Sequence, residues 1–106
     1  MDFDLFETET GYELAIDLPG VAESDVEISL ENRVLKIKAK REGEETGERK
    51  ELRRRRALDL EETLRFPVEL DAEAVEASLE NGVLRLVLPK QKKELPRKIE
   101  VKRIVG

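Results

Sequence analysis

The stretch Val26–Leu35, which reads VEISLENRVL, recurs 49 positions later as Val75–Leu84, which reads VEASLENGVL. Eight of the ten positions are identical in the two copies. In each copy apolar and polar residues alternate, which is typical of half-buried strands, and a two-residue polar turn separates two such strands. Two amphipathic hairpins of this kind can pack apolar face to apolar face as a sandwich of two sheets. The similarity could equally reflect two separate hairpins that meet the same structural requirements. The sandwich prediction is unchanged in that case.

The other apolar residues keep the same period of two. Residues 12–17 form one alternating strand, and a longer run of constant parity covers residues 58–70. Glu62 interrupts that run, and Pro67, on the opposite parity, indicates an edge or a bend. The pattern predicts an all-β domain of about six strands over residues 1–89.

Composition limits the possible functions of this chain of 106 residues. It has no Cys and no His, which removes disulfides, thiolate metal sites and the commonest acid/base group near neutrality. No phosphate-binding loop motif is present, and the Ser and Thr residues have no His to activate them. We therefore expect neither an enzyme nor a bound cofactor or metal.

Charge dominates the sequence, with 42% charged residues and a net charge of −5. This balance favours solubility and argues against wholesale nucleic-acid binding. With no basic-then-apolar leader and no apolar run of roughly 20 residues, we expect a soluble cytoplasmic protein without membrane contact. The scarcity of Asn, Gln and Met beside this charge is a tendency of proteins from hot environments.

The segment 41–56 between the two hairpins cannot belong to a core, because twelve of its sixteen residues are charged. Gly43 and Gly47 loosen its backbone further. Loops longer than about 12 residues are usually functional or disordered. Two interpretations remain open at this point: a solvated excursion, or a segment that becomes ordered against a second chain.

Four consecutive arginines, Arg53–Arg56, end this loop and could in principle grip phosphates. Alternation would send them to both faces of a strand, and the chain lacks the aromatic platforms of single-strand binders. Five glutamates lie just upstream, between positions 42 and 51. Neutralisation within the loop or across a dimer is the interpretation that we favour.

The C-terminal part begins with a basic linker, residues 90–98, in which five of nine residues are Lys or Arg. Pro96 favours an extended conformation for it. Ile99 and Val101 then share one face of a strand-like tail, residues 99–106. We expect an apolar surface to receive this pair.

Three motifs carry a family resemblance: Asp17–Val21 (DLPGV), the run from Glu80 to Lys90 that contains ENGVL and LPK, and Ile99–Val101 (IEV). Their order around a charged central loop resembles the α-crystallin domain of small heat shock proteins, from Asp4 onward. The resemblance implies an immunoglobulin-like β-sandwich with an extended C-terminal tail. It also implies an ATP-independent holdase of the stress response, which keeps unfolding client proteins from aggregating.

In that family the central loop, here about residues 41–52, contributes a strand that reaches the partner's edge, here about residues 4–8, in a swapped homodimer. The residues implied at this contact are Leu5, Phe6, Gly43, Gly47, Leu52, Arg53 and Arg55. Ile99 and Val101 resemble the plug that enters an apolar groove of a neighbouring dimer, which permits higher homo-oligomers. The implied groove residues are Val26, Ile28, Leu30, Val75, Ala77 and Leu79. The linker is long enough to reach a neighbour and equally able to fold back onto its own chain.

Two departures from the family pattern limit what carries over. Glu62 occupies the position where family members usually carry an Arg, so the ion pairs of that Arg are not expected here. An apolar N-terminal arm usually precedes the domain, whereas few residues precede the first expected strand here, which leaves assembly into large shells open.

An alternative is a passive co-chaperone adaptor that resembles CS-domain proteins and docks on one defined partner. Adaptors need neither the isoleucine-x-valine plug nor the long swapped loop. A stable dimer through residues 41–52 would favour the holdase, and a monomer that binds one chaperone would favour the adaptor.

Overall fold

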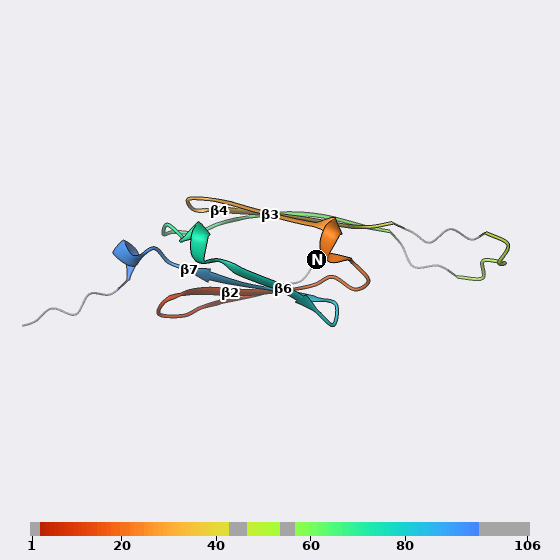
Figure 1. The fold of residues 1–106 in the computed structure, drawn as a ribbon, viewed down its shortest axis with the longest axis horizontal. Coiled ribbons are helices and arrows are strands. Elements are labelled where there is room, and N and C mark those ends of the chain that lie inside the picture. Colours follow the sequence, from red (N-terminus) through yellow and green to blue (C-terminus); the bar gives the residue numbers. More distant parts are fainter. Residues whose placement is uncertain (1–2, 43–46, 54–56, 96–106) are drawn as a thin grey trace, which may run out of the picture.

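The computed structural model describes residues 3–42, 47–53 and 57–95, which form seven antiparallel strands in two layers (Figure 1). The strands are β1 (Phe3–Glu7), β2 (Gly11–Asp17), β3 (Val26–Glu31), β4 (Val34–Arg41), β5 (Leu58–Arg65), β6 (Glu76–Glu80) and β7 (Val83–Pro89). One sheet has the order β1-β2-β7-β6, and the other has the order β3-β4-β5. Three short 3-10 helices join the strands: η1 (Glu23–Asp25), η2 (Ala72–Ala74) and η3 (Lys92–Glu94). The predicted all-β sandwich is therefore confirmed, with β1 as a strand additional to the six expected from periodicity.

The two repeats form one hairpin in each sheet. Strands β3 and β4 pair in the three-stranded sheet, and β6 and β7 pair in the four-stranded sheet. Asn81 and Gly82 adopt φ values of 51° and 74°, the positive values that a tight primed hairpin turn requires. Asn32 adopts a similar φ of 53° at the matching position of the first copy.

The core lies between the sheets and is built from the alternating apolar positions. Leu14 pairs with Leu86 across β2 and β7, and Ile16 pairs with Leu84, so the two strands present their apolar sets to the same side. Burial of this face supplies the main driving force for folding. The buried side chains are Tyr12, Leu14, Ile16, Leu18, Val21, Leu35, Ile37, Ala39, Leu60, Phe66, Leu70, Leu84, Leu86 and Leu88.

The run of constant parity at 58–70 is divided between a strand and a bend. Strand β5 ends at Arg65, and the chain then crosses to the other sheet, where Leu70 forms an isolated bridge with Lys90. Phe66 and Leu70 stay buried on either side of the exposed Pro67, which confirms the bend. Phe66 and Leu70, which continue the parity of β5, are thus buried although β5 itself ends at Arg65.

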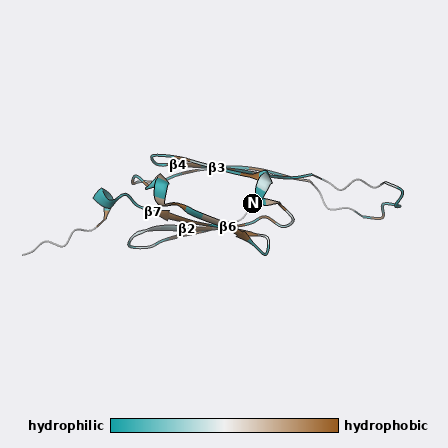
Figure 2. Cartoon of the chain, viewed as in Figure 1, coloured by the Kyte–Doolittle hydropathy of each residue, from teal (hydrophilic) through white to brown (hydrophobic). Residues whose placement is uncertain are grey.

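Strand β5 is also an edge strand of its sheet, which explains why a charged side chain can stand on its core-facing side. Glu62 lies opposite Ile37 of β4 on the core-facing side, yet it is only half-buried. An inward-pointing charge on an edge strand opposes unwanted strand addition. The charged connection between β4 and β5 leaves the sandwich at this sheet (Figure 1), and Figure 2 shows its described part in hydrophilic colours.

Candidate functional site

An open apolar groove lies between the edge strands of the two sheets, β3 and β6. It has a volume of about 220 Å³ and is lined by Glu23, Val26, Ile28, Ala77, Ser78, Leu79 and Leu84. Each wall is an edge strand, so each keeps one row of backbone N–H and C=O groups without a strand partner among the described residues. Such an edge can pair with an added extended segment.

The strand registers of the two hairpins determine which side chains face the groove. Ile28 lies opposite Ile37, and Ala77 lies opposite Leu86, so both walls present the same parity as the buried core. Because their strands are edges, Val26, Ile28 and Leu79 remain half-buried and Ala77 is exposed. The groove is therefore an apolar surface that the chain does not cover with its described residues.

Four of the six residues expected to receive the plug line this groove, namely Val26, Ile28, Ala77 and Leu79. Leu30 and Val75 are half-buried against the core but do not line the groove. Glu23, Ser78 and Leu84 line it without having been expected. Leu84 could have been inferred, because it faces Leu79 across the second hairpin. Glu23 could not, because no local signal places η1 at the groove.

The expected plug, Ile99 and Val101, lies outside the described residues. The chain leading to it is fixed as far as η3 by contacts with residues 69 and 70. The Lys93 ammonium lies 2.6 Å from Glu69 Oε2, and the Gln91 backbone N–H donates to the Glu69 carbonyl at 3.0 Å. The hydrogen bond from Lys93 lowers the pKa of the Glu69 carboxyl, and the same contact raises the pKa of Lys93. The described part of the linker is therefore held on the sandwich by these contacts.

The opposite edge of the four-stranded sheet, β1, carries the apolar residues expected at the dimer contact. Leu5 is 41% exposed although it lies on the core-facing side opposite Leu14, which shows that the second sheet does not cover it. Phe6 is 61% exposed on the outer face, where Ala15 and Val87 join it around a hollow of about 240 Å³. These are apolar side chains on a strand edge that no other described strand pairs with.

An ion pair fixes the end of β1 to the end of β7. Lys90 Nζ lies 3.3 Å from Glu7 Oε2 and 5.4 Å from the centre of the Tyr12 ring. Burial, followed by the neighbouring Glu7 carboxylate, raises the pKa of Tyr12. The ion pair therefore adds to the pairing of β1 with β2 in holding the edge strand on its sheet.

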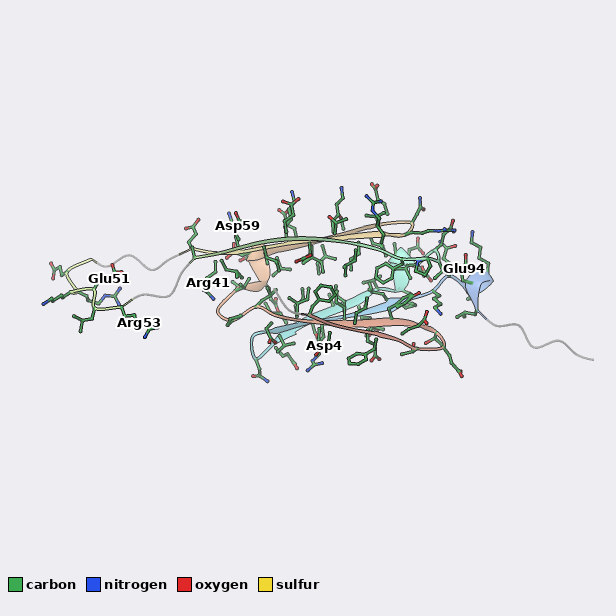
Figure 3. The ribbon with its side chains drawn as sticks, turned by 180° about the vertical axis from the view of Figure 1, so that it is seen from behind. Asp4, Arg41, Glu51, Arg53, Asp59 and Glu94 are labelled. Carbon is green, nitrogen blue, oxygen red and sulfur yellow. The ribbon has the colours of Figure 1, made fainter. Side chains whose placement is uncertain are left out.

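The described part of the charged loop, residues 47–53, forms a turn and two bends rather than a strand. Gly47 supplies a φ of 58° in this turn. Leu52 is 85% exposed, and Figure 3 places Glu51 and Arg53 far from both sheets. Gly43 and Arg55 lie outside the described residues. The loop strand expected at a dimer contact is not formed in residues 47–53 of the isolated chain, and it stays a prediction.

Within the described residues no group of three or more His, Cys, Asp or Glu side chains is arranged to hold a metal ion. None of the helices described is long and apolar enough to cross a membrane.

The described residues thus form a seven-stranded sandwich with an apolar groove between two edge strands. The model of the Hsp20/alpha crystallin family matches residues 4–102, and the chain belongs to this family. The family expected from the three motifs is thereby confirmed.

Two relatives and two solved structures illustrate the similarity. Small heat shock protein C2 of Rickettsia felis is 35% identical over 101 residues, which cover 93% of this chain and 66% of that protein. Spore protein SP21 of Stigmatella aurantiaca is 37% identical over 101 residues, covering 93% and 60%. The chain thus spans less than two thirds of the length of these curated relatives.

Heat shock protein 16.0 from Schizosaccharomyces pombe matches with a TM-score of 0.74 and 27% identity over 96% of each chain. A small heat-shock protein from Xylella fastidiosa, described as having a distinct high order structure, matches with a TM-score of 0.70 and 28% identity. That match covers 96% of this chain and 95% of the other.

Proposed function

We propose that this chain is an ATP-independent holdase chaperone of the stress response that binds unfolding proteins in the groove between β3 and β6. The observation that carries this proposal is the groove itself, which joins half-buried apolar side chains to two unpaired strand edges. Unfolding proteins expose extended apolar segments, and such segments can bury their side chains in the groove and pair with an edge. Membership of the Hsp20/alpha crystallin family supports the same activity.

The proposed working unit is a homodimer, with higher homo-oligomers built from it. Residues 41–52 of one chain would add to the free edge of β1 in its partner, where Leu5 and Phe6 are exposed. Leu52, which is 85% exposed in the isolated chain, would be buried at this contact. Arg53 and Arg55 would lie at its border.

The tail is proposed to regulate access to the groove. Ile99 and Val101 would occupy the groove in the resting state and leave it when the protein is heated. Burial of two such side chains contributes only a few kcal/mol at about 25 cal/mol per Å², before the ordering entropy of the tail is subtracted. A contact of this strength opens readily and frees the groove for clients.

The proposed activity is binding alone, without a catalytic group, a cofactor or a nucleic-acid ligand, and with the cytoplasm as its place of action. The net charge of −5 would keep complexes with clients in solution.

Light scattering of a heated, aggregation-prone enzyme, with ATP omitted, tests the proposal. The parent chain should suppress scattering at near-stoichiometric amounts. Ala77→Arg should abolish most of this suppression, because it places a long charged side chain at an exposed position of the groove wall. Ala72→Arg in η2 is the matched control, since Ala72 is also exposed but does not line the groove.

Absence of suppression by the parent chain would overturn the holdase proposal. Equal suppression by both arginine variants would leave a holdase that does not use this groove, which also contradicts the proposal as stated.

A further inference from the structure

The outer face of the four-stranded sheet carries an exposed apolar patch, which lies apart from the groove between β3 and β6. Phe6 of β1 is 61% exposed and Val87 of β7 is 43% exposed. Ala15 and Val83 share the outward parity of their strands and are half-buried in the same face. Contiguous apolar surface of this kind on a folded chain often marks an interaction site.

Two shallow hollows make the patch concave. One has a volume of about 240 Å³, and its lining includes Phe6, Ala15 and Val87. The other has a volume of about 220 Å³, and its lining includes Phe6, Ala15 and Val83. Phe6, Ala15 and Arg85 line both, so the two hollows adjoin. An apolar side chain of a partner can therefore bury area at this face.

Carboxylates surround the apolar patch. On both sides of β7, the cross-strand neighbours of Val83 and Val87 are acidic. Asp4 of β1, which lies opposite Ala15, adds a further carboxylate. The single basic residue in the four strands is Arg85. The five acidic residues of this face are Asp4, Glu13, Asp17, Glu76 and Glu80, and all five are exposed.

The outer face of the three-stranded sheet has a different character. Lys38 of β4 lies between Glu27 of β3 and Glu61 of β5, and Lys40 lies opposite Asp59. None of the exposed large apolar side chains among the described residues belongs to these three strands. The five carboxylates of the four-stranded sheet, by contrast, take part in no ion pair within the described residues. Of the two outer faces, one therefore combines apolar exposure with an excess of negative charge.

Charge and size together determine which partner this face fits. A negative surface attracts cationic segments and repels a second copy of this chain, whose net charge is −5. Four strands about 4.8 Å apart, with about five residues of about 3.4 Å each, give a face of roughly 300 Å². Stable contacts between two folded proteins bury about 800 Å² on each partner. The face therefore suits a short segment better than a folded domain.

We propose that the outer face of the four-stranded sheet binds short cationic segments of other proteins, in which an aromatic or aliphatic side chain is flanked by Lys or Arg. The apolar side chain enters the hollows beside Phe6, and the flanking basic groups lie over Glu13 and Asp17. No residue lines both these hollows and the groove between β3 and β6, so binding here requires neither the groove nor the tail. A strand added to the edge of β1 would extend the sheet in its own plane and leave this face open.

Peptide binding to the full chain tests the proposal. The probe is a labelled peptide with Phe and Val at its centre and two lysines at each end, and fluorescence anisotropy gives its Kd in 0.05 M sodium chloride. A peptide with the lysines replaced by Gln should bind about tenfold more weakly, because several exposed ion pairs each contribute a modest part. In 0.5 M sodium chloride the two peptides should differ by no more than about twofold, since salt screens exposed charges.

Three variants of the protein locate the binding face. Glu13→Gln with Asp17→Asn removes two carboxylates that line the hollows and should weaken binding of the lysine peptide about fivefold. Asp59→Asn with Glu61→Gln removes the same charge from the other sheet and should change the Kd by no more than about twofold. Ala77→Arg, in the groove between β3 and β6, should also leave binding unchanged.

Phe6→Ser tests the apolar part of the contact. It should weaken the lysine and Gln peptides alike, by about fivefold, because it removes the ring that lines both hollows. Phe6 is 61% exposed, so the fold should persist, and thermal unfolding of each variant beside the parent chain checks this.

Three outcomes would overturn the proposal. Equal binding of the lysine and Gln peptides, or equal weakening by the two pairs of carboxylate substitutions, would show that the charge of this face does not matter. Loss of binding in Ala77→Arg would place the peptide in the groove between β3 and β6. A changed sedimentation coefficient for Glu13→Gln with Asp17→Asn would make the face a contact between copies of this chain. None of these results depends on suppression of aggregation, so they leave the proposed holdase activity to its own test.

Discussion

Ile28 of β3 and Ala77 of β6 form opposite walls of one groove, and they occupy equivalent positions in the two copies of the repeat, 49 residues apart. The larger side chain is therefore on one wall and the smaller on the other. The cross-strand pair within each hairpin fixes the direction of the side chain, since Ile28 lies opposite Ile37 and Ala77 lies opposite Leu86. Two similar local units thus build a single binding surface.

This equivalence predicts that the two walls can exchange side chains. Ile28→Ala alone should lower the free energy of unfolding by about 2 kcal/mol, since half-buried apolar side chains lie at the low end of the cost of truncation to Ala. Adding Ala77→Ile should restore about half of this loss, because it returns apolar area to the same groove. Urea unfolding of both variants measures the effect. If the second substitution costs further stability, the two walls do not share one packing space.

Leu52 should affect the dimer and not the stability of the single chain. Because this side chain is 85% exposed, Leu52→Asp should change unfolding of the monomer by no more than about 0.5 kcal/mol. Burial of a Leu contributes about 1.5 to 3 kcal/mol, so the same change should weaken the dimer by at least about tenfold. Sedimentation velocity over a concentration series measures the dimer Kd, with Leu52→Met as the control that keeps the apolar volume. An unchanged Kd for Leu52→Asp would exclude Leu52 from the contact.

Gly11 is required by the close approach of β2 and β7. A Cβ atom at this position would lie 2.3 Å from the Leu88 carbonyl oxygen and 2.8 Å from Pro89 Cα, and both of these are backbone atoms. Gly11→Ala should therefore lower the free energy of unfolding by about 2 kcal/mol or more, because strands must move apart.

Gly47→Ala is the control for this prediction. A Cβ atom at Gly47 would meet nothing within 4 Å, and only its φ of 58° opposes the substitution. Its cost should be about 1 kcal/mol. Chemical denaturation that gave equal losses for the two variants would contradict the steric explanation at Gly11.

The ion pair between Glu69 and Lys93 predicts how acid loosens the base of the tail. The hydrogen bond from Lys93 lowers the pKa of Glu69 in the folded chain below the ordinary value of 4.5. Its contribution to stability is therefore complete above that ordinary value and is lost as the pH falls through the lowered pKa. Glu69→Gln should remove this part of the acid dependence of Tm between neutral pH and pH 3.

Thermal unfolding across this pH range measures the difference from the parent chain. Glu73→Gln in η2 serves as the control, because it removes a nearby exposed carboxylate that forms no ion pair with the described residues. A parallel loss of acid dependence in both variants would show that general charge, and not the Lys93 contact, is responsible.

Much of the fold could be predicted because a period of two is a local property of a strand. Residues that alternate with polar neighbours, such as Leu35 and Ile37, are buried as the pattern indicates. Pro67 correctly marked the bend after β5. The extent of β5 was not predictable in this way, since Phe66 and Leu70 continue the same parity while the chain changes sheets.

The candidate site was predictable in part. The alternation in each repeat indicated which side chains share a face, and four of the six expected residues line the groove. Leu30 and Val75 have the same parity but do not line it, because alternation specifies the face of a strand and not how far along the strand the groove extends. The position of Glu23 depends on how η1 lies over the sheet end, which no short-range signal specifies.

The sequence by itself determined the all-β sandwich, the two equivalent hairpins and the membership of its family, because alternation, turn residues and motif order are properties of short stretches of chain. Only the tertiary structure decided that β3 and β6 are both sheet edges on the same side of the sandwich. Strand order depends on pairings between residues far apart in the chain, such as Leu14 and Leu86, and on which apolar faces remain after the core is filled. The groove exists for that reason, since it consists of the apolar surface that the two layers leave uncovered.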